Sequence, residues 1–199
     1  ETNELSLILR AGALPAPLIV MEERSIGPGL GADSVAAGQV AAIVGLVLVI
    51  IYMILSYGFF GVLANIALAV NITLILGTLS FIQATLTLPG IAGIVLTMGM
   101  AVDANVLVFE RIREELRRGR NVMAAIEGGY QRAISTIIDS NLTTLFAALF
   151  LYGFGSGPIR GFAVTLAIGI ITSLFTAVMV TRMLIIIWLE RKRPRELVL

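Results

Sequence analysis

The chain has 199 residues, of which 58% are hydrophobic and only 14% carry a charge. Soluble domains average roughly 45–50% apolar and about 25% charged residues, so this composition argues against an ordinary soluble protein. The sequence also holds neither His nor Cys. Their absence excludes disulfides, thiol nucleophiles, His-ligated metals and Ser-His-Asp catalysis, and leaves any proton chemistry to carboxylates.

Long uncharged runs predict the elements of the chain in order. No residue between Asp33 and Asp103 is charged, and two further uncharged runs separate Asp139 from Arg160 and Arg160 from Arg182. A helix needs about 20 apolar residues to span a bilayer. We therefore expect an all-α, polytopic membrane bundle of five transmembrane helices, roughly at residues 36–56, 60–82, 88–110, 136–157 and 161–188.

Turn-forming residues separate these expected spans. Residues 57–61 (YGFFG) follow the first, Pro89 and Gly90 open the third, and residues 153–158 (GFGSGP) divide the fourth from the fifth. Between the third and fourth spans we expect a helical link at residues 111–134. In this link Asn121 caps a short helix, and the pair Gly128-Gly129 ends it.

The basic residues predict a topology. Most of the 14 Lys and Arg residues fall in the link and in the C-terminal tail. Because cytoplasmic loops carry an excess of Lys and Arg, the link and the tail are expected in the cytoplasm. An odd number of spans then puts the N-terminal end outside. We expect an external segment and connector at 1–34, a transmembrane bundle at 35–190 and a basic tail at 191–199. Residues 1–34 contain no signal peptide, so an export signal or a first span is expected upstream.

Asp103 is the most unusual position, because it lies well inside the third expected span. A carboxylate at the centre of a membrane helix costs about 2.5–3.5 kcal/mol on insertion scales, and such residues are functional candidates by default. Gly99 lies one turn earlier on the same face, where it would let a neighbouring helix approach closely. A stripe of small residues, Gly93, Thr97, Ala101 and Asn105, has the spacing that packs membrane helices. Asp103 is either a protonation switch or a hydrogen-bonded structural residue.

Other polar residues form a second group of candidates. Asp139 and Thr143 share one face near the start of the fourth span, beside Asn141. They form either a functional polar patch or the interfacial start of a helix. Asn71 in the second span is explained by hydrogen bonding between helices. Arg182, in the last span, is close enough to its cytoplasmic end to extend its charge to the interface.

Several segments carry a resemblance to a known family. They are residues 10–17 (RAGALPAP), 22–28 (EERSIGP), 88–97 (LPGIAGIVLT), 102–107 (VDANVL) and 110–112 (ERI). In order and spacing, from about residue 5 to residue 190, they resemble SecD of the SecD/SecF family, a shortened branch of the resistance–nodulation–division superfamily. The motif around Asp103 is the most specific of them.

The resemblance implies a function and a set of partners. SecD works with SecF, each with six spans, to assist preprotein movement through the SecYEG channel at the expense of the proton gradient. The resemblance makes Asp103 the proton-relay residue. From their positions in the spans we expect six polar or small residues to support it: Gly99, Asn105, Asn71, Asp139, Asn141 and Thr143. The resemblance also implies spans two to six of SecD, preceded by the end of a periplasmic domain at 1–34. It further implies the bacterial inner membrane, YajC and YidC as additional partners, contact with membrane lipids, no cofactor, no metal, no nucleic acid and no enzymatic activity.

Three alternatives remain open from the residues. A small-molecule or lipid exporter of the same superfamily would use a similar intramembrane Asp. An intramembrane aspartyl protease would need Asp103 and Asp139 at equal depth, sharing one proton. A non-catalytic assembly scaffold would not need the carboxylate at all. Sodium is also an alternative to protons as the coupling ion, since carboxylate and amide oxygens suit both.

Overall fold

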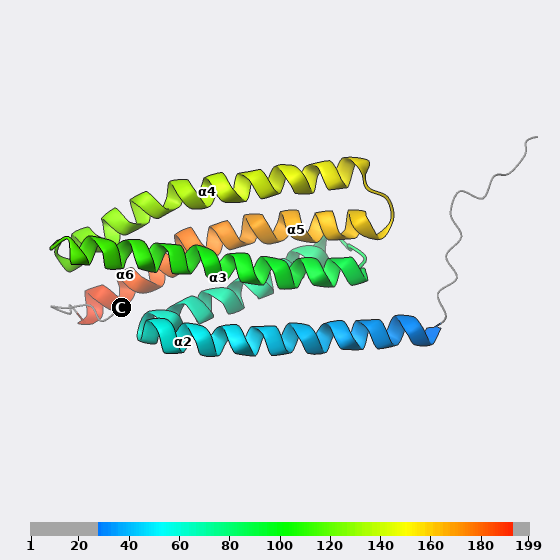
Figure 1. Cartoon of the computed structure of the whole chain (residues 1–199), viewed down its shortest axis with the longest axis horizontal. Coiled ribbons are helices and arrows are strands. Elements are labelled where there is room, and N and C mark those ends of the chain that lie inside the picture. The colour runs from blue at the N-terminus through cyan, green and yellow to red at the C-terminus, as the bar shows by residue number, and fades with distance from the viewer. Residues whose placement is uncertain (1–27, 193–199) are drawn as a thin grey trace, which may run out of the picture. The chain divides into compact units, whose positions relative to one another are not determined.

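The computed structural model of the chain describes the backbone of residues 28–192 and the side chains of residues 33–192. Contacts divide the chain into two units, Glu1–Ala32 and Asp33–Leu199. The expected tail beyond residue 192 and residues 1–27 of the expected connector, with the RAGALPAP segment and all but the last residue of EERSIGP, lie outside the described residues. In the described range the chain is wholly built of helices and short turns, as an all-α bundle requires (Figure 1).

The expected number of separate spanning helices, five, is wrong. In the described residues, four helices are long and apolar enough to cross a membrane. The difference lies in α2 (Pro28–Phe81), which runs through the expected break at residues 57–61 and begins well before residue 36. Only Gly58 leaves the helical conformation, with φ 52° and ψ −121°. At this point α2 folds back on itself, so that its two arms lie side by side (Figure 1).

The reversal of α2 depends on two glycines. Gly58 adopts a positive φ, which side chains with a Cβ rarely tolerate. A Cβ on Gly61 would collide with the backbone carbonyl of Met53. Between the arms, Asn65 Nδ2 donates a hydrogen bond of 3.2 Å to the carbonyl of Ile50. A full loop is therefore unnecessary, and each arm remains long enough for about one bilayer crossing.

The two helices that follow α2 are each capped by a polar side chain. Thr87 caps α3 (Leu88–Arg117) by accepting a hydrogen bond of 3.2 Å from the amide of Gly90. Asn121 caps α4 (Val122–Phe154) through a bond of 2.8 Å from the amide of Ala124, as expected. The pair Gly128-Gly129, however, does not end this helix. A Cβ on Gly129 would lie 2.8 Å from the backbone nitrogen of Ile112, so the glycine serves close packing of α4 on α3.

The last span is continuous but not uniform. It runs through α5 (Pro158–Phe175), a π-helical turn η1 (Thr176–Val180) and α6 (Thr181–Lys192). The expected stripe of small residues on α3 packs against α5: a side chain on Gly93 would collide with Thr165, and one on Gly169 would collide with Thr97. Glycine and threonine thus let the two backbones approach closely, as is common in membrane bundles.

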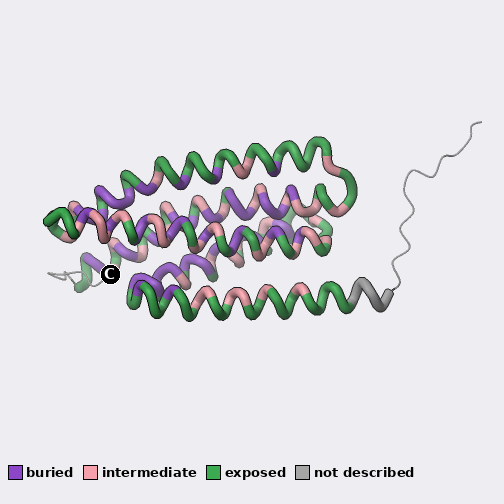
Figure 2. The backbone as a smooth tube through the Cα atoms, viewed as in Figure 1, coloured by how far each residue is buried: buried purple, intermediate pink, exposed green. Residues whose placement is uncertain are grey.

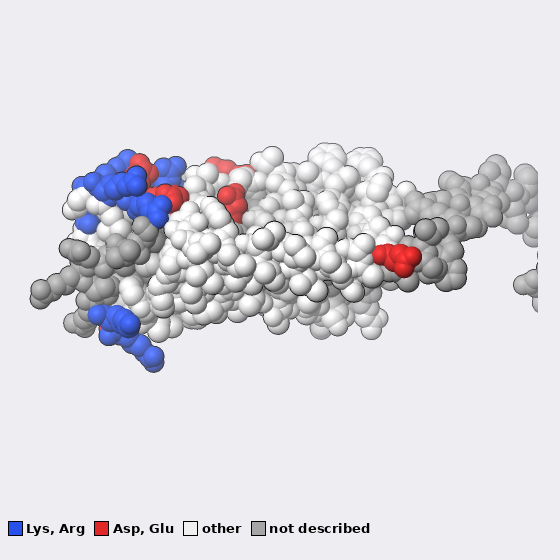
Figure 3. Space-filling view, turned by 60° about the horizontal axis from the view of Figure 1, so that its bottom comes forward, with Lys and Arg blue, Asp and Glu red and all other residues white. Residues whose placement is uncertain are grey.

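The exposed surface is mostly apolar, and the basic residues gather at one end. Figure 2 shows that the first arm of α2 is exposed along most of its length. In Figure 3, Lys and Arg cluster at the end of the bundle where α3 passes into α4. A long uncharged band with charges at its end is what a multi-pass membrane protein needs, because lipid replaces water around the band.

A buried carboxylate holds the basic end together. Glu115, at the end of α3, is 0% exposed. Its oxygens lie 2.9 Å from nitrogens of Arg118, Arg120 and Arg132, which belong to the end of α3, the turn and α4. One acidic side chain therefore ties three parts of the α3–α4 connection, and three cations compensate its burial.

We expect Glu115→Ala to lower the free energy of unfolding by about 2 kcal/mol, because hydrogen bonds to a charged group contribute about 1.5–3 kcal/mol and the three arginines, nearly half exposed, remain solvated. Glu114→Ala is the matched control, since Glu114 also pairs with arginines but is 39% exposed; exposed pairs contribute about 0–1 kcal/mol. Steric trapping in bicelles measures both. Equal losses in the two variants would contradict the structural role given to Glu115.

Candidate functional site

Asp103 lies on an exposed face of α3, at a groove between α3 and α4. The groove encloses a cavity of about 140 Å³. From α3 it is lined by Met100, Asp103, Ala104 and Leu107. Asp103 therefore lies at the surface of the described bundle and not in its interior.

The α4 side of the same groove is polar. Ser140, Asn141 and Thr144 line it together with Ile137. The hydroxyls of Ser140 and Thr144 donate to carbonyls of their own helix, at 3.1 Å each, and Asn141 is buried. Asp103 therefore shares a narrow groove with three uncharged polar side chains of α4.

Within the described residues, no Lys or Arg lies within ion-pairing distance of Asp103. The described ion pairs all gather around Glu110, Glu114 and Glu115 at the basic end. An intramembrane carboxylate without a cation is costly when it is charged. Any cation that pairs with Asp103 would therefore come from outside the described residues.

The structure brings only some of the expected site residues together. Asn141 joins Asp103 in the groove, whereas Asp139 and Thr143 lie on an exposed face of α4 and do not line it. The Thr143 hydroxyl donates instead to the carbonyl of Asp139, at 2.9 Å. Gly99 borders a separate cavity of about 90 Å³ beside α2. The helix contact expected at Gly99 is not made in the described part of the chain, where nothing approaches within 4 Å of a Cβ at this position.

The remaining two candidates point into the bundle. Asn105 is 3% exposed, and its Oδ1 accepts a hydrogen bond of 2.9 Å from Thr181 at the start of α6. The Thr181 hydroxyl also lies 3.2 Å from the carbonyl of Thr176 in the π-helical turn. Asn71 is 0% exposed, and its amide has no hydrogen-bond partner among the described residues. The hydrogen bond between helices that we expected of Asn71 is therefore not formed among the described residues. A hydrogen bond of this kind is formed by Asn105, and it connects α3 to α6.

Sequence reasoning missed several residues of this region. It placed Asp139 and Thr143 on the functional face, but the face that borders Asp103 is one residue further round, with Ser140 and Thr144. These two are also four residues apart, so the helical spacing alone fits either pair. Glu115 was missed because its run of charges resembles a solvated helix end. Thr181 gave no signal, since its importance depends on a partner 76 positions away.

Comparison with known families and proteins agrees with this architecture. The family model described as protein export membrane protein SecD/SecF, C-terminal, matches residues 16–191. The chain is 56% identical over 197 residues to protein translocase subunit SecD of Magnetococcus marinus and 58% identical to that of Rickettsia bellii. In both alignments it covers 99% of its own length but 38% of the relative's. The chain therefore spans little more than a third of the curated relatives it matches.

Solved structures give the same result. The chain is similar to the crystal structure of SecDF, a translocon-associated membrane protein from Thermus thermophilus, with a TM-score of 0.87 and 46% sequence identity. This match covers 100% of the chain and 28% of that protein. A SecDF structure in a super-membrane-facing form matches with a TM-score of 0.80 over 98% of the chain and 27% of that protein. By sequence, by family model and by fold, the chain belongs to the SecD/SecF family of protein-export membrane proteins.

Proposed function

We propose that the protein is a membrane subunit of the Sec protein-export machinery. With SecF it uses the proton gradient to promote preprotein translocation through the SecYEG channel, in association with YajC and YidC. Family membership supports this role, and the observation that carries the mechanism is the position of Asp103 in an outward-facing polar groove. The protein performs mechanical work in this proposal and makes or breaks no covalent bond.

In the proposed mechanism Asp103 alternates between a charged and a neutral state. When charged, it attracts a cation that SecF presents to the groove; when protonated, it loses this attraction, which is strong where water is scarce. The groove supports the idea, since the described residues supply polar atoms but no cation. One proton crossing about 100 mV delivers roughly 2.3 kcal/mol, enough to bias two arrangements of the helices.

We propose further that the protein lies in the bacterial inner membrane with its basic end in the cytoplasm. The link between α3 and α4 and the end of α6 then face the cytoplasm, while the N-terminal end faces the periplasm. The gathering of Lys and Arg at one end of the bundle supports this orientation (Figure 3). The Asp103 groove would then open within the membrane, between the cytoplasmic end and the bilayer centre.

Asp103→Asn keeps the shape of the side chain but cannot be charged. We expect it to assemble with SecF and to lose the gradient-stimulated part of preprotein translocation by at least about tenfold, because the attraction between charges in the membrane is absent. Proteoliposomes with and without an imposed proton gradient measure this. Asp139→Asn is the matched control and is expected to retain stimulation, since Asp139 does not line the groove. Full stimulation in Asp103→Asn would point instead to a scaffold.

Asn141→Leu tests the polar wall of the groove. We expect gradient-stimulated translocation to fall about tenfold, because leucine removes the one amide that lines the groove with Asp103 and makes a charged state of the carboxylate more costly. Asn71→Leu is the control: Asn71 is equally a buried asparagine of a span, but it lies outside the groove. Similar losses in both variants, at equal assembly with SecF, would contradict a special role for the groove.

A further inference from the structure

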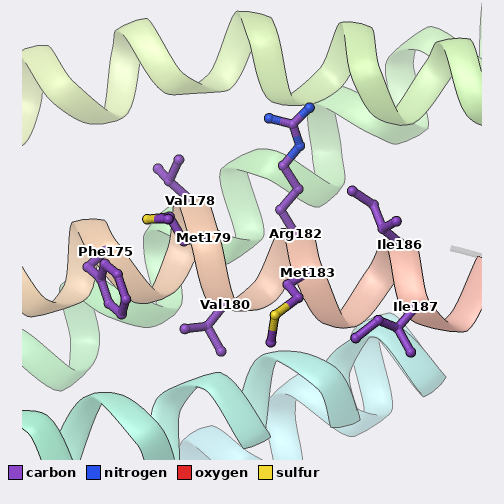
Figure 4. Close-up of a pocket in the computed structure, with 8 residues that line it drawn as sticks. All are labelled: Phe175, Val178, Met179, Val180, Arg182, Met183, Ile186 and Ile187. Atoms are coloured by element: carbon purple, nitrogen blue, oxygen red, sulfur yellow. The ribbon is translucent and has the colours of Figure 1, made fainter.

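The last span carries a second groove, which is mostly apolar, unlike the groove at Asp103. It encloses about 510 Å³ and follows the end of α5, the π-helical turn and α6. Seven of its lining residues are apolar, and the eighth is Arg182; the apolar ones are Phe175, Val178, Met179, Val180, Met183, Ile186 and Ile187. Figure 4 shows that Val178, Arg182 and Ile186 point towards α4, whereas Val180, Met183 and Ile187 point the opposite way.

Arg182 is a cation without an anionic partner in this groove. It forms no ion pair with any described residue; its guanidinium lies over the ring of Tyr130 on α4, 5.7 Å from the ring centroid. Tyr130 is 1% exposed, so the contact holds the arginine against the bundle. An aromatic face attracts a cation only by about 0.5–2 kcal/mol and leaves the hydrogen-bond donors of the guanidinium edge available.

The depth of Arg182 suits a lipid phosphate. At a rise of 1.5 Å per residue, Arg182 lies about 9 Å inside the expected end of the span at residue 188. An arginine near the end of a span extends its charge towards the interface, where lipid phosphates lie. Its planar fork of donors matches a phosphate group in geometry as well as in charge.

From these observations we propose that the groove binds an anionic glycerophospholipid of the phosphatidylglycerol type. Its phosphate pairs with Arg182, and an acyl chain lies along Met179, Val178 and Phe175, away from the basic end. Charge complementarity selects this occupant. The groove is apolar from Phe175 to Val180, and beyond this stretch Arg182 supplies a cation that has no ion pair with a described residue, so the groove matches a lipid with an apolar chain and an anionic headgroup. A zwitterionic lipid would fill the same groove but would bring its own cation next to Arg182. The proposal does not depend on the role of Asp103.

The test uses the protein reconstituted in phosphatidylcholine vesicles that contain a spin-labelled lipid, either phosphatidylglycerol or phosphatidylcholine. Electron paramagnetic resonance then gives the fraction of each lipid that is immobilised by the protein. We expect a preference for phosphatidylglycerol that falls about fivefold in Arg182→Gln, since one basic residue near the surface is worth about that factor. Arg182→Lys should keep part of the preference, and Met179→Trp should lower the immobilised fraction of both lipids by filling the groove.

Arg191→Gln is the matched control. Arg191 lies on the same helix and at the same basic end but does not line the groove, so the variant should retain the preference. Equal losses in Arg182→Gln and Arg191→Gln would assign the preference to general surface charge and overturn the proposal. So would the lack of any preference in the unaltered protein, as expected if another membrane helix covers this face. If Arg182→Gln fails to fold, Arg182→Lys and Met179→Trp still decide, because unaltered binding in both would refute the site.

Discussion

The close contact between α3 and α5 decides which side of α3 faces outward. Gly93 and Thr97 lie against Thr165 and Gly169, and a larger side chain at either glycine would force the two helices apart. Successive residues of a helix are rotated by about 100°, so two residues that are two positions apart lie on roughly opposite faces. Asn105 therefore points inward to Thr181, and Asp103 must point outward to the groove. The position of the carboxylate follows from packing between small residues elsewhere on its helix.

The sequence predicts well whatever depends on neighbouring residues. The cap at Asn121, the start of α3 at Pro89, the glycine-rich turn before Pro158 and the uncharged length of each span all depend on short segments. The bend of α2 shows the limit of this approach. Its residues indicate a break, yet a single residue with positive φ suffices to reverse the chain, and the helix continues on both sides. A turn signal predicts a change of direction better than it predicts a loop.

Features that depend on distant partners were not predictable in the same way. Gly128 and Gly129 have the composition of a helix end, but α3 packs against them and the helix continues through both. Glu115 is one of several charges in a polar segment, and its burial follows from where Arg120 and Arg132 come to lie. The polar wall of the groove differs by one residue from the expected face, because only the rotation of α4 against α3 selects between two equally spaced pairs.

The charged side chains of the two grooves differ in whether they can be neutralised within the membrane. Asp103 can become neutral by binding a proton, and the cost of its charge in a span, about 2.5–3.5 kcal/mol, is close to the roughly 2.3 kcal/mol that a proton gains across 100 mV. Its charge state is therefore within reach of the gradient. Arg182 cannot lose its proton under the same conditions. The Tyr130 ring compensates part of this charge, and the proposed lipid phosphate would compensate the rest. A carboxylate is thus suited to a switching site and an arginine to a fixed one; Asp103 lies in a groove with a polar wall, whereas Arg182 lies in an apolar groove.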